Sequence, residues 1–259
     1  MNGGTSRART LFLTLLLAAF PLGAQNPADL QQPISTDRPS VANSSVVVPK
    51  AVLQIENGLL ITSNDGQHIL DLPESSLRYG LFNKTELRLA VPNYFQDLGT
   101  GAASGFGDIA IGAKHQLGPM RGLDLSVIFF LSLPGGAHDI SSHGYDPGLQ
   151  FPWSHKLSAN WTAGGQVAFY WPTQAGEHVF TGESTFYLVR SLARSWDAFA
   201  EYAGDFPRRG GPRHLLHFGS AYRIAPRHQI DFHVAAGLSR AAPDVFVGAG
   251  YSFLFRLAK

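Results

Sequence analysis

The stretch that most constrains the fold is the last regular one in the chain, residues 244–255. Its side chains alternate, and one face consists wholly of Val245, Val247, Ala249, Tyr251, Phe253 and Phe255. A period of two indicates a β-strand, because successive side chains of a strand point to opposite faces. A usual strand has roughly 5–6 residues, whereas a tilted strand needs about 9–11 to cross a bilayer. The stretch therefore predicts a strand that crosses a membrane and closes a barrel, although residues 256–259 follow the aromatic residue at which such strands typically end.

Partner strands for this stretch recur along the chain. From Lys50 onward, alternating apolar and polar runs are separated by residues typical of turns. The clearest run, 161–171, has a Trp at each end of its apolar face, where rings lie at the two interfaces of a membrane barrel. The weakest is 145–157, because Pro147 and Pro152 remove donors from the ladder. We expect about twelve strands, at residues 53–61, 73–81, 86–91, 105–117, 123–133, 145–157, 161–171, 178–192, 196–203, 214–224, 228–238 and 244–255.

The connections between these runs alternate in length. Those near residues 82, 118, 158, 194 and 226 are short, and those at 93–104, 134–144, 173–177 and 204–212 are longer, with brief exceptions near 65 and 241. An up-and-down barrel has short periplasmic turns and longer outer loops, whereas a soluble β-sandwich does not account for the alternation. We therefore predict an all-β, transmembrane, up-and-down antiparallel β-barrel with a short extended N-terminal arm. An even number of strands would place both termini on the periplasmic side.

The N-terminal fifth of the chain divides into two further segments. Residues 1–24 have a positive start, a short apolar core and a small-residue end, the pattern of a secretory signal peptide; an uncleaved anchor helix is the alternative. Residues 25–49 are polar, contain four prolines and lack periodicity, so they form a periplasmic arm or plug ahead of a barrel at 50–259. The predicted location is the bacterial outer membrane, reached through the signal peptide.

Composition narrows the classes of function. Charged residues make up 15% of the chain, below the roughly 25% of soluble domains. The net charge is +1 and the arginines are scattered, so no nucleic-acid partner is indicated. The absence of cysteine excludes disulfide scaffolds, thiolate metal sites, cysteine nucleophiles and a lipid-anchored N-terminal cysteine.

Several short motifs follow one another along the chain. They are Ser35-Thr-Asp-Arg-Pro39, Val48-Pro-Lys50, Leu53-Gln-Ile-Glu-Asn-Gly58, Leu72-Pro-Glu74, Leu77-Arg-Tyr-Gly-Leu81, Glu86-Leu-Arg-Leu89, Gly105-Phe-Gly-Asp-Ile-Ala-Ile-Gly112 and Asp244-Val-Phe-Val-Gly-Ala-Gly250. In this order they resemble the phenol-degradation meta-pathway family of outer-membrane barrels. The resemblance covers essentially the whole mature chain. It implies an outer-membrane barrel that passes small hydrophobic molecules, aromatic ones among them.

If the apolar faces meet lipid, the opposite faces line the lumen. Charges of both signs there suit networks that hold or pass solutes, while the alternative is that they only satisfy one another and fill the interior. Glu86, Arg88 and Arg78 are the best candidates for an ion-paired cluster. The full set of expected lumen residues is Gln54, Glu56, Arg78, Glu86, Arg88, Asp108, Lys114, Gln166, Glu183, Glu201, Asp231 and His233.

A twelve-stranded barrel should have a narrow or obstructed passage, because eight strands are filled by side chains and sixteen leave a channel. The arm is the expected obstruction. Asp37 and Arg38 would be costly in lipid but are tolerated in a polar lumen, so we expect them to enter the barrel from the periplasmic side. A disordered tail is the alternative.

Metal, cofactor and covalent chemistry are not indicated. His214 and His217, like His228 and His233, are spaced so that each pair points to opposite faces, and His138 and His143 lack an acidic framework. A barrel lipid hydrolase would need a serine and a histidine in contact. Neither Ser142–His143 nor Ser154–His155 makes a convincing pair, so we expect no enzyme.

Two other classes of function stay open as alternatives to transport. The first is a structural or adhesive barrel whose loops carry the contacts, with Arg208, Arg209 and Arg213 as candidates for lipopolysaccharide phosphates. The second is the lipid hydrolase. The expected partners are outer-membrane lipid and lipopolysaccharide, the barrel-assembly machinery and a small-molecule solute.

Overall fold

The computed structural model describes residues 33–99 and 101–257. The predicted signal peptide at 1–24 and the first part of the arm, 25–32, lie outside the described residues. Within the described ranges, no helix is long and apolar enough to cross a membrane.

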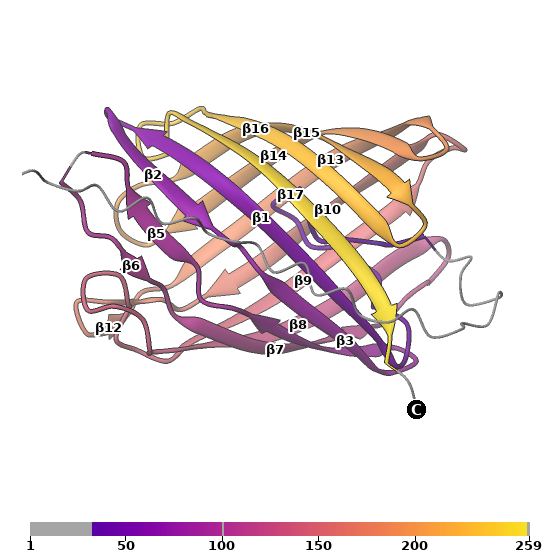
Figure 1. Ribbon diagram of the computed structural model, residues 1–259, viewed down its shortest axis with the longest axis horizontal. Helices are drawn as coiled ribbons and strands as arrows, with labels where there is room; N and C mark the ends of the chain where they lie inside the picture. Colours follow the sequence, from indigo (N-terminus) through magenta and orange to yellow (C-terminus); the bar gives the residue numbers. More distant parts are fainter. Residues whose placement is uncertain (1–32, 100, 258–259) are drawn as a thin grey trace, which may run out of the picture. The chain divides into compact units, whose positions relative to one another are not determined.

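Twelve antiparallel strands follow one another around a closed barrel (Figure 1). The ring closes because the first and last strands pair along their length, from Val52 opposite Arg256 to Ser63 opposite Val245. The predicted fold class and strand count are therefore confirmed. In order around the ring the strands are β1 (Val52–Asn64), β3 (Ser76–Phe82), β4 (Thr85–Ala90), β7 (Ile109–Gln116), β8 (Leu123–Leu133), β9 (Asp146–Lys156), β10 (Trp161–Tyr170), β13 (Thr181–Ala193), β14 (Trp196–Pro207), β15 (Arg213–Ala225), β16 (His228–Gly237) and β17 (Val245–Arg256).

Three neighbouring strands of the ring are interrupted and continue as short extensions. β2 (Gln67–Leu72) continues β3 along β1, β5 (Tyr94–Asp97) continues β4, and β6 (Gly105–Phe106) continues β7. Pro73 and Pro92 lie in two of the interruptions, where a residue without an N–H weakens the ladder. The predicted loop at 93–104 is thus wrong in part, because β5 lies within it. The strand expected from residue 73 begins instead at Gln67 and breaks at 73–75.

Most of the longer connections lie at one end of the barrel and most of the shorter ones at the other, with 65–66 and 117–122 as exceptions. At the turn end, the chain reverses at 83–84, 117–122, 157–160, 194–195 and 226–227; at the loop end it does so at 65–66, 98–104, 134–145, 171–180, 208–212 and 238–244. The loop at 171–180 carries a small hairpin of β11 (Thr173–Gln174) and β12 (Glu177–His178). The loop expected from residue 204 begins only after Pro207, because Asp205 and Phe206 continue the alternation of β14.

The strands separate an apolar exterior from a polar interior. The exposed large side chains include Leu59, Ile61, Phe186, Phe218 and Phe232, as lipid contact requires. The sequence neighbours of Phe186, Phe218 and Phe232 on the opposite face include the buried polar residues Thr185, His217, Asp231 and His233. In β9, whose two prolines made it the least certain prediction, the register with β8 passes from Leu125–Trp153 to Ile128–Gln150. The missing N–H of Pro152 therefore coincides with a gap in the ladder.

Candidate functional site

The interior of the barrel is occupied by the chain's own N-terminal arm, residues 33–49, which runs in indigo among the strands in Figure 1. The arm begins at the turn end, where the N–H of Ile34 donates to the carbonyl of Pro226 at 2.9 Å. It returns to the wall at Pro49, whose carbonyl accepts from the N–H of Val52 at 3.1 Å. Residues 33–49 form no helix or named strand, so their backbone donors need other partners.

Side chains of the strands supply those partners. The N–H of Asp37 donates to Glu56 at 2.9 Å, and the N–H of Val48 donates to Glu86 at 2.6 Å. Farther around the ring, Glu201 accepts from the N–H groups of Val41 and Ala42 at 2.8 and 2.9 Å. Hydrogen bonds to ionised acceptors are among the stronger ones in proteins. The wall thus holds the arm through the same carboxylates that the sequence assigns to the lumen.

Six charged groups form the central ion cluster, in which Asp37 is the arm's contribution. Arg78 donates to Glu56 and Glu86, both at 2.9 Å, and lies 3.2 Å from Asp37. Arg88 donates to Glu86 at 3.1 Å and also binds Asp37. Lys114, whose Nζ donates to the carbonyl of Ser44 at 2.8 Å, completes the cluster. Its members are Asp37, Glu56, Arg78, Glu86, Arg88 and Lys114, so acids and bases are equal in number.

Asp37 is held in its ionised form by these neighbours. Burial by itself raises the pKa of the carboxyl, but the charges of Arg78, Arg88 and Lys114 outweigh burial and hold the pKa well below its usual range. The N–H of Ser44 donates to the same carboxylate at 2.8 Å and acts in the same direction. At neutral pH the arm therefore contributes a negatively charged Asp37 carboxylate to the cluster.

Arg38 makes a second anchor, at the seam where β1 and β17 close the barrel. Its guanidinium donates to Glu74 at 2.6 Å and to Asp231 at 3.3 Å. Burial lowers the pKa of Arg38, but Asp231 and Glu74 raise it by more. Gly58 and Gly250 are register partners across the seam, and a Cβ on either would meet the Arg38 side chain at 2.3–2.4 Å. Two facing glycines thus make room for the guanidinium.

A chain of hydrogen bonds runs from Arg38 through two histidines to Glu201. Arg38 Nη2 lies 3.4 Å from His233 Nε2, His233 Nδ1 lies 3.0 Å from His217 Nε2, and His217 Nδ1 lies 2.8 Å from Glu201. If each histidine is neutral with its proton on Nδ1, every link has one donor and one acceptor. The chain joins Arg38 to the carboxylate that holds the arm at Val41 and Ala42.

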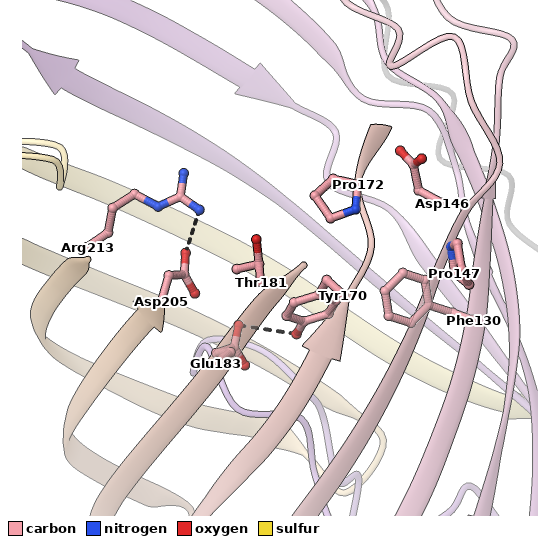
Figure 2. Close-up of a pocket in the computed structure, with 9 residues that line it drawn as sticks. All are labelled: Phe130, Asp146, Pro147, Tyr170, Pro172, Thr181, Glu183, Asp205 and Arg213. Atoms are coloured by element: carbon pink, nitrogen blue, oxygen red, sulfur yellow. Dashed lines mark hydrogen bonds and ion pairs between the residues drawn. The ribbon is translucent and has the colours of Figure 1, made fainter. Parts of the chain in front are cut away.

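Asn43 lies between two cavities in the lumen. Its side-chain amide donates to Gln166 at 2.9 Å and to Gln150 at 3.2 Å. On the loop-end side is a cavity of about 270 Å³, shown in Figure 2, whose lining includes Tyr170 and Glu183. On the turn-end side is one of about 370 Å³, lined by the arm and by wall residues such as Thr162 and Tyr187. On β10 and β13 alike, the residues of the two cavities lie at opposite ends of the strand.

The structure brings most of the expected lumen residues to the arm. Glu56, Arg78, Glu86, Arg88, Gln166, Glu201, Asp231 and His233 each lie within reach of it or of a residue that touches it. Glu183 is one step removed and accepts from Gln166 at 2.8 Å. Asp108 stays apart, since it accepts from the N–H groups of Gly135, Gly136 and Ser142 and so fastens the 134–144 loop.

Four contributors were not among the lumen residues predicted from the sequence. His217 and Tyr170 lie on the same strand face as other polar residues of β15 and β10, and that parity is the signal that could have identified them. Glu74 has the same parity as Arg78 in the run expected at 73–81, so the same signal applied to it, although residues 73–75 are irregular in the structure. Asn43 belongs to the arm, where no periodicity indicates which way a side chain points.

In the part of the chain that the structure describes, neither a metal site nor either of the two serine–histidine pairs considered from the sequence is assembled. No group of three or more His, Cys, Asp or Glu residues there could hold a metal ion. Ser142 donates to Asp108 while His143 contacts the carbonyl of His138, at 3.3 and 2.8 Å. Ser154 bonds to Ser45 and His155 to the carbonyl of Gly122. In these contacts neither serine is bonded to its neighbouring histidine.

Comparisons with known proteins agree with the barrel. Residues 36–255 match the family described as "Putative MetA-pathway of phenol degradation". An outer membrane channel from Pseudomonas putida F1 superposes with a TM-score of 0.64 at 10% identity, covering 82% of this chain and 98% of that one. The KdgM porin superposes with a TM-score of 0.56 at 8% identity, covering 78% and 99%. No curated protein matches the chain by sequence. At these identities the two structures show the fold, which is that of outer-membrane barrels.

Proposed function

The chain belongs to the MetA-pathway of phenol degradation family, and on that premise we propose that it is an outer-membrane channel for small hydrophobic molecules, aromatic ones among them. The closed barrel with its apolar exterior suits the outer membrane. The similar barrels are by name a channel and a porin, which supports transport in preference to catalysis.

The observation that carries the proposal is the arm between two cavities. A purely structural barrel has no need of hollows on both sides of an internal segment. Between residues 33 and 48 the arm is held by hydrogen bonds and ion pairs to wall side chains rather than by strand pairing. Such contacts can be exchanged without breaking the sheet, so we assign the arm the role of a plug.

Single-channel conductance in a planar bilayer tests the proposal. The mature protein should give small discrete steps that a small aromatic solute blocks. Deletion of residues 25–45 should enlarge the steps several-fold, because it removes the segment between the two cavities. The substitution Arg209→Ala, in an exposed ion pair with Glu177 at the loop end, is the control and should leave the steps unchanged. Unaltered conductance after the deletion would contradict the plug.

Export and partners belong to the same proposal. We assign residues 1–24 to a cleaved signal peptide, after which the barrel-assembly machinery inserts the protein among outer-membrane lipid and lipopolysaccharide. N-terminal sequencing of protein purified from an outer-membrane fraction tests the cleavage. A mature chain that begins at or close to residue 25 is expected, whereas retention of Arg7 and Arg9 would contradict it.

A structural barrel without transport is the second candidate. It is favoured by the balance of charge in the central ion cluster, which leaves no unpaired charge there to attract a solute. Stable insertion with no conductance, before and after deletion of the arm, would decide for it.

A further inference from the structure

The loop-end cavity is built by the ends of several strands. Phe130 comes from β8, Pro147 from β9, Tyr170 from β10 and Glu183 from β13 (Figure 2). The remaining lining residues are Asp146, Pro172, Thr181, Asp205 and Arg213. Residues on strands are held more precisely than residues on loops. The cavity is therefore a preformed feature of the wall.

Its size and walls fit one aromatic ring. The volume is about 270 Å³, and an apolar cavity of about 150 Å³ is large enough for benzene. The rings of Phe130 and Tyr170 lie 5.7 Å apart between centroids and are tilted by 50°. Pro147 and Pro172 add two further apolar surfaces. Aromatic pairs favour such tilted or offset geometries, so an entering ring finds partners of the right kind.

The polar groups of the cavity are mostly acceptors. Glu183 accepts from Tyr170 Oη at 3.2 Å and from Gln166 at 2.8 Å. An ionised carboxylate has about four acceptor positions, so Glu183 retains capacity for another donor. Asp146 is bonded to Thr173 at 2.6 Å, and Asp205 is paired with Arg213 at 3.0 Å. Three carboxylates against one guanidinium make the cavity unfavourable for an anion.

Together these features define what the cavity accepts. We propose that it is the outer recognition subsite for a single uncharged aromatic ring that carries a hydroxyl or amino donor, with Glu183 as the acceptor and Phe130 and Tyr170 as the ring contacts. The inference deepens the proposed channel function and rests on it. A ring without a donor leaves Glu183 without the added bond, and a ring with a carboxylate is repelled.

Binding of three probes to the full-length protein in lipid nanodiscs tests the ligand class. At pH 8 phenol is neutral with a donor, toluene lacks the donor and benzoate is an anion. Saturation-transfer NMR against empty nanodiscs should show saturable binding of phenol. Toluene should bind about tenfold more weakly, the effect of roughly one charge-assisted hydrogen bond. Benzoate should bind at least as weakly as toluene, because repulsion by the carboxylates adds to the loss of that bond. Equal binding of the three, or a preference for benzoate, would overturn the inference.

Two variants locate the binding, with a matched control. Glu183→Gln should reduce the preference for phenol over benzoate to about threefold or less, because the acceptor survives without its charge. Glu177→Gln, at an exposed position on the neighbouring β12, should leave the preference unchanged. Thr181→Phe should fill the cavity and abolish saturable phenol binding. A folded Thr181→Phe barrel that binds phenol as before, or a Glu183→Gln variant with unchanged preference, would contradict the assignment.

A measurement of phenol flux distinguishes failure of this inference from failure of the proposed channel function. Entry of phenol into liposomes that carry the protein is measured beside binding. Flux without saturable binding would overturn the subsite and leave the channel standing. If binding is saturable and Glu183→Gln alters it, but no flux is seen, the subsite is supported and the proposed transport function is contradicted.

Discussion

Arg78 shows how much of this protein depends on single buried charges. Its side chain is fully buried, and three carboxylates surround it. Burial of one charge is expensive unless the charge is paired and hydrogen-bonded. The wall and the arm each contribute part of that pairing, so neither is electrostatically complete without the other.

Replacement of Arg78 should therefore destabilise the folded protein. Arg78→Ala leaves Glu56 and Glu86 buried without their main partner, and loss of one member of a buried ion pair typically costs about 3–5 kcal/mol. Urea unfolding of the refolded barrel, followed by tryptophan fluorescence, measures the change. Arg213→Ala, in a more exposed pair, should cost about 1 kcal/mol or less. Equal losses for the two variants would contradict the argument.

The pKa of Asp37 gives the docking of the arm a pH dependence. Because the docked carboxyl has a depressed pKa, docking is stabilised at pH values above the ordinary value of about 3.9. That stabilisation is lost as the pH falls from there through the docked pKa. The contribution of Asp37 should thus keep conductance constant from pH 8 to about 5 and let it rise only below about 4. In Asp37→Asn the conductance should be raised at every pH, without the acidic rise. A rise between pH 7 and 5 that this substitution removes would contradict the assignment.

At the scale of elements, the arm and the seam fit each other through two glycines. Gly58→Ala places a Cβ at 2.3 Å from the guanidinium of Arg38, which is the far end of a flexible side chain. The expected result is displacement of Arg38 and a larger conductance, with the barrel intact. Gly182→Ala is the matched control, since its Cβ would meet nothing closer than 3.9 Å. Failure of Gly58→Ala to change conductance would show that Arg38 does not hold the plug.

The strands themselves could be predicted because each one must keep a lipid face and an interior face. This requirement imposes an alternation of apolar and polar or small residues on every long strand, as in β10 and β17. The interruptions between β2 and β3 and between β4 and β5 could not be placed. In the adjoining β2, polar side chains occur at both parities, as at Gln67 and His68, so alternation is weak there.

At the scale of the whole molecule, the arm joins parts of the wall that are distant in sequence. Parity indicated which side chains point inward, and hence Arg78, Glu86 and Arg88 as a group. It could not indicate that Asp37 enters among them, because the arm has no period and its position depends on the complete three-dimensional set of partners. Tertiary charge pairing, which no local pattern encodes, decides that part of the site.

A separate peptide of residues 33–49, added in solution, should block the barrel from which the arm has been deleted. The described contacts of the arm up to Val48 are noncovalent and mostly to side chains, so the tether mainly supplies an effective concentration, of about millimolar order. Added peptide near that concentration should return the conductance toward that of the intact protein. The same peptide with Asp37→Asn and Arg38→Ala should have no effect. Equal block by both peptides would show that the charges do not direct docking.

The position of Arg38 across the seam also concerns how the protein is made. The seam joins the first and last strands, so it forms only after the whole chain has arrived. Arg38 already contacts Asp231 on β16 and the carbonyl of Ala249 on β17, and it precedes every strand in the chain. We therefore expect the barrel to close around the docked arm. The protein would then be assembled in its plugged state of low conductance, and a wider opening would require a later release of the arm.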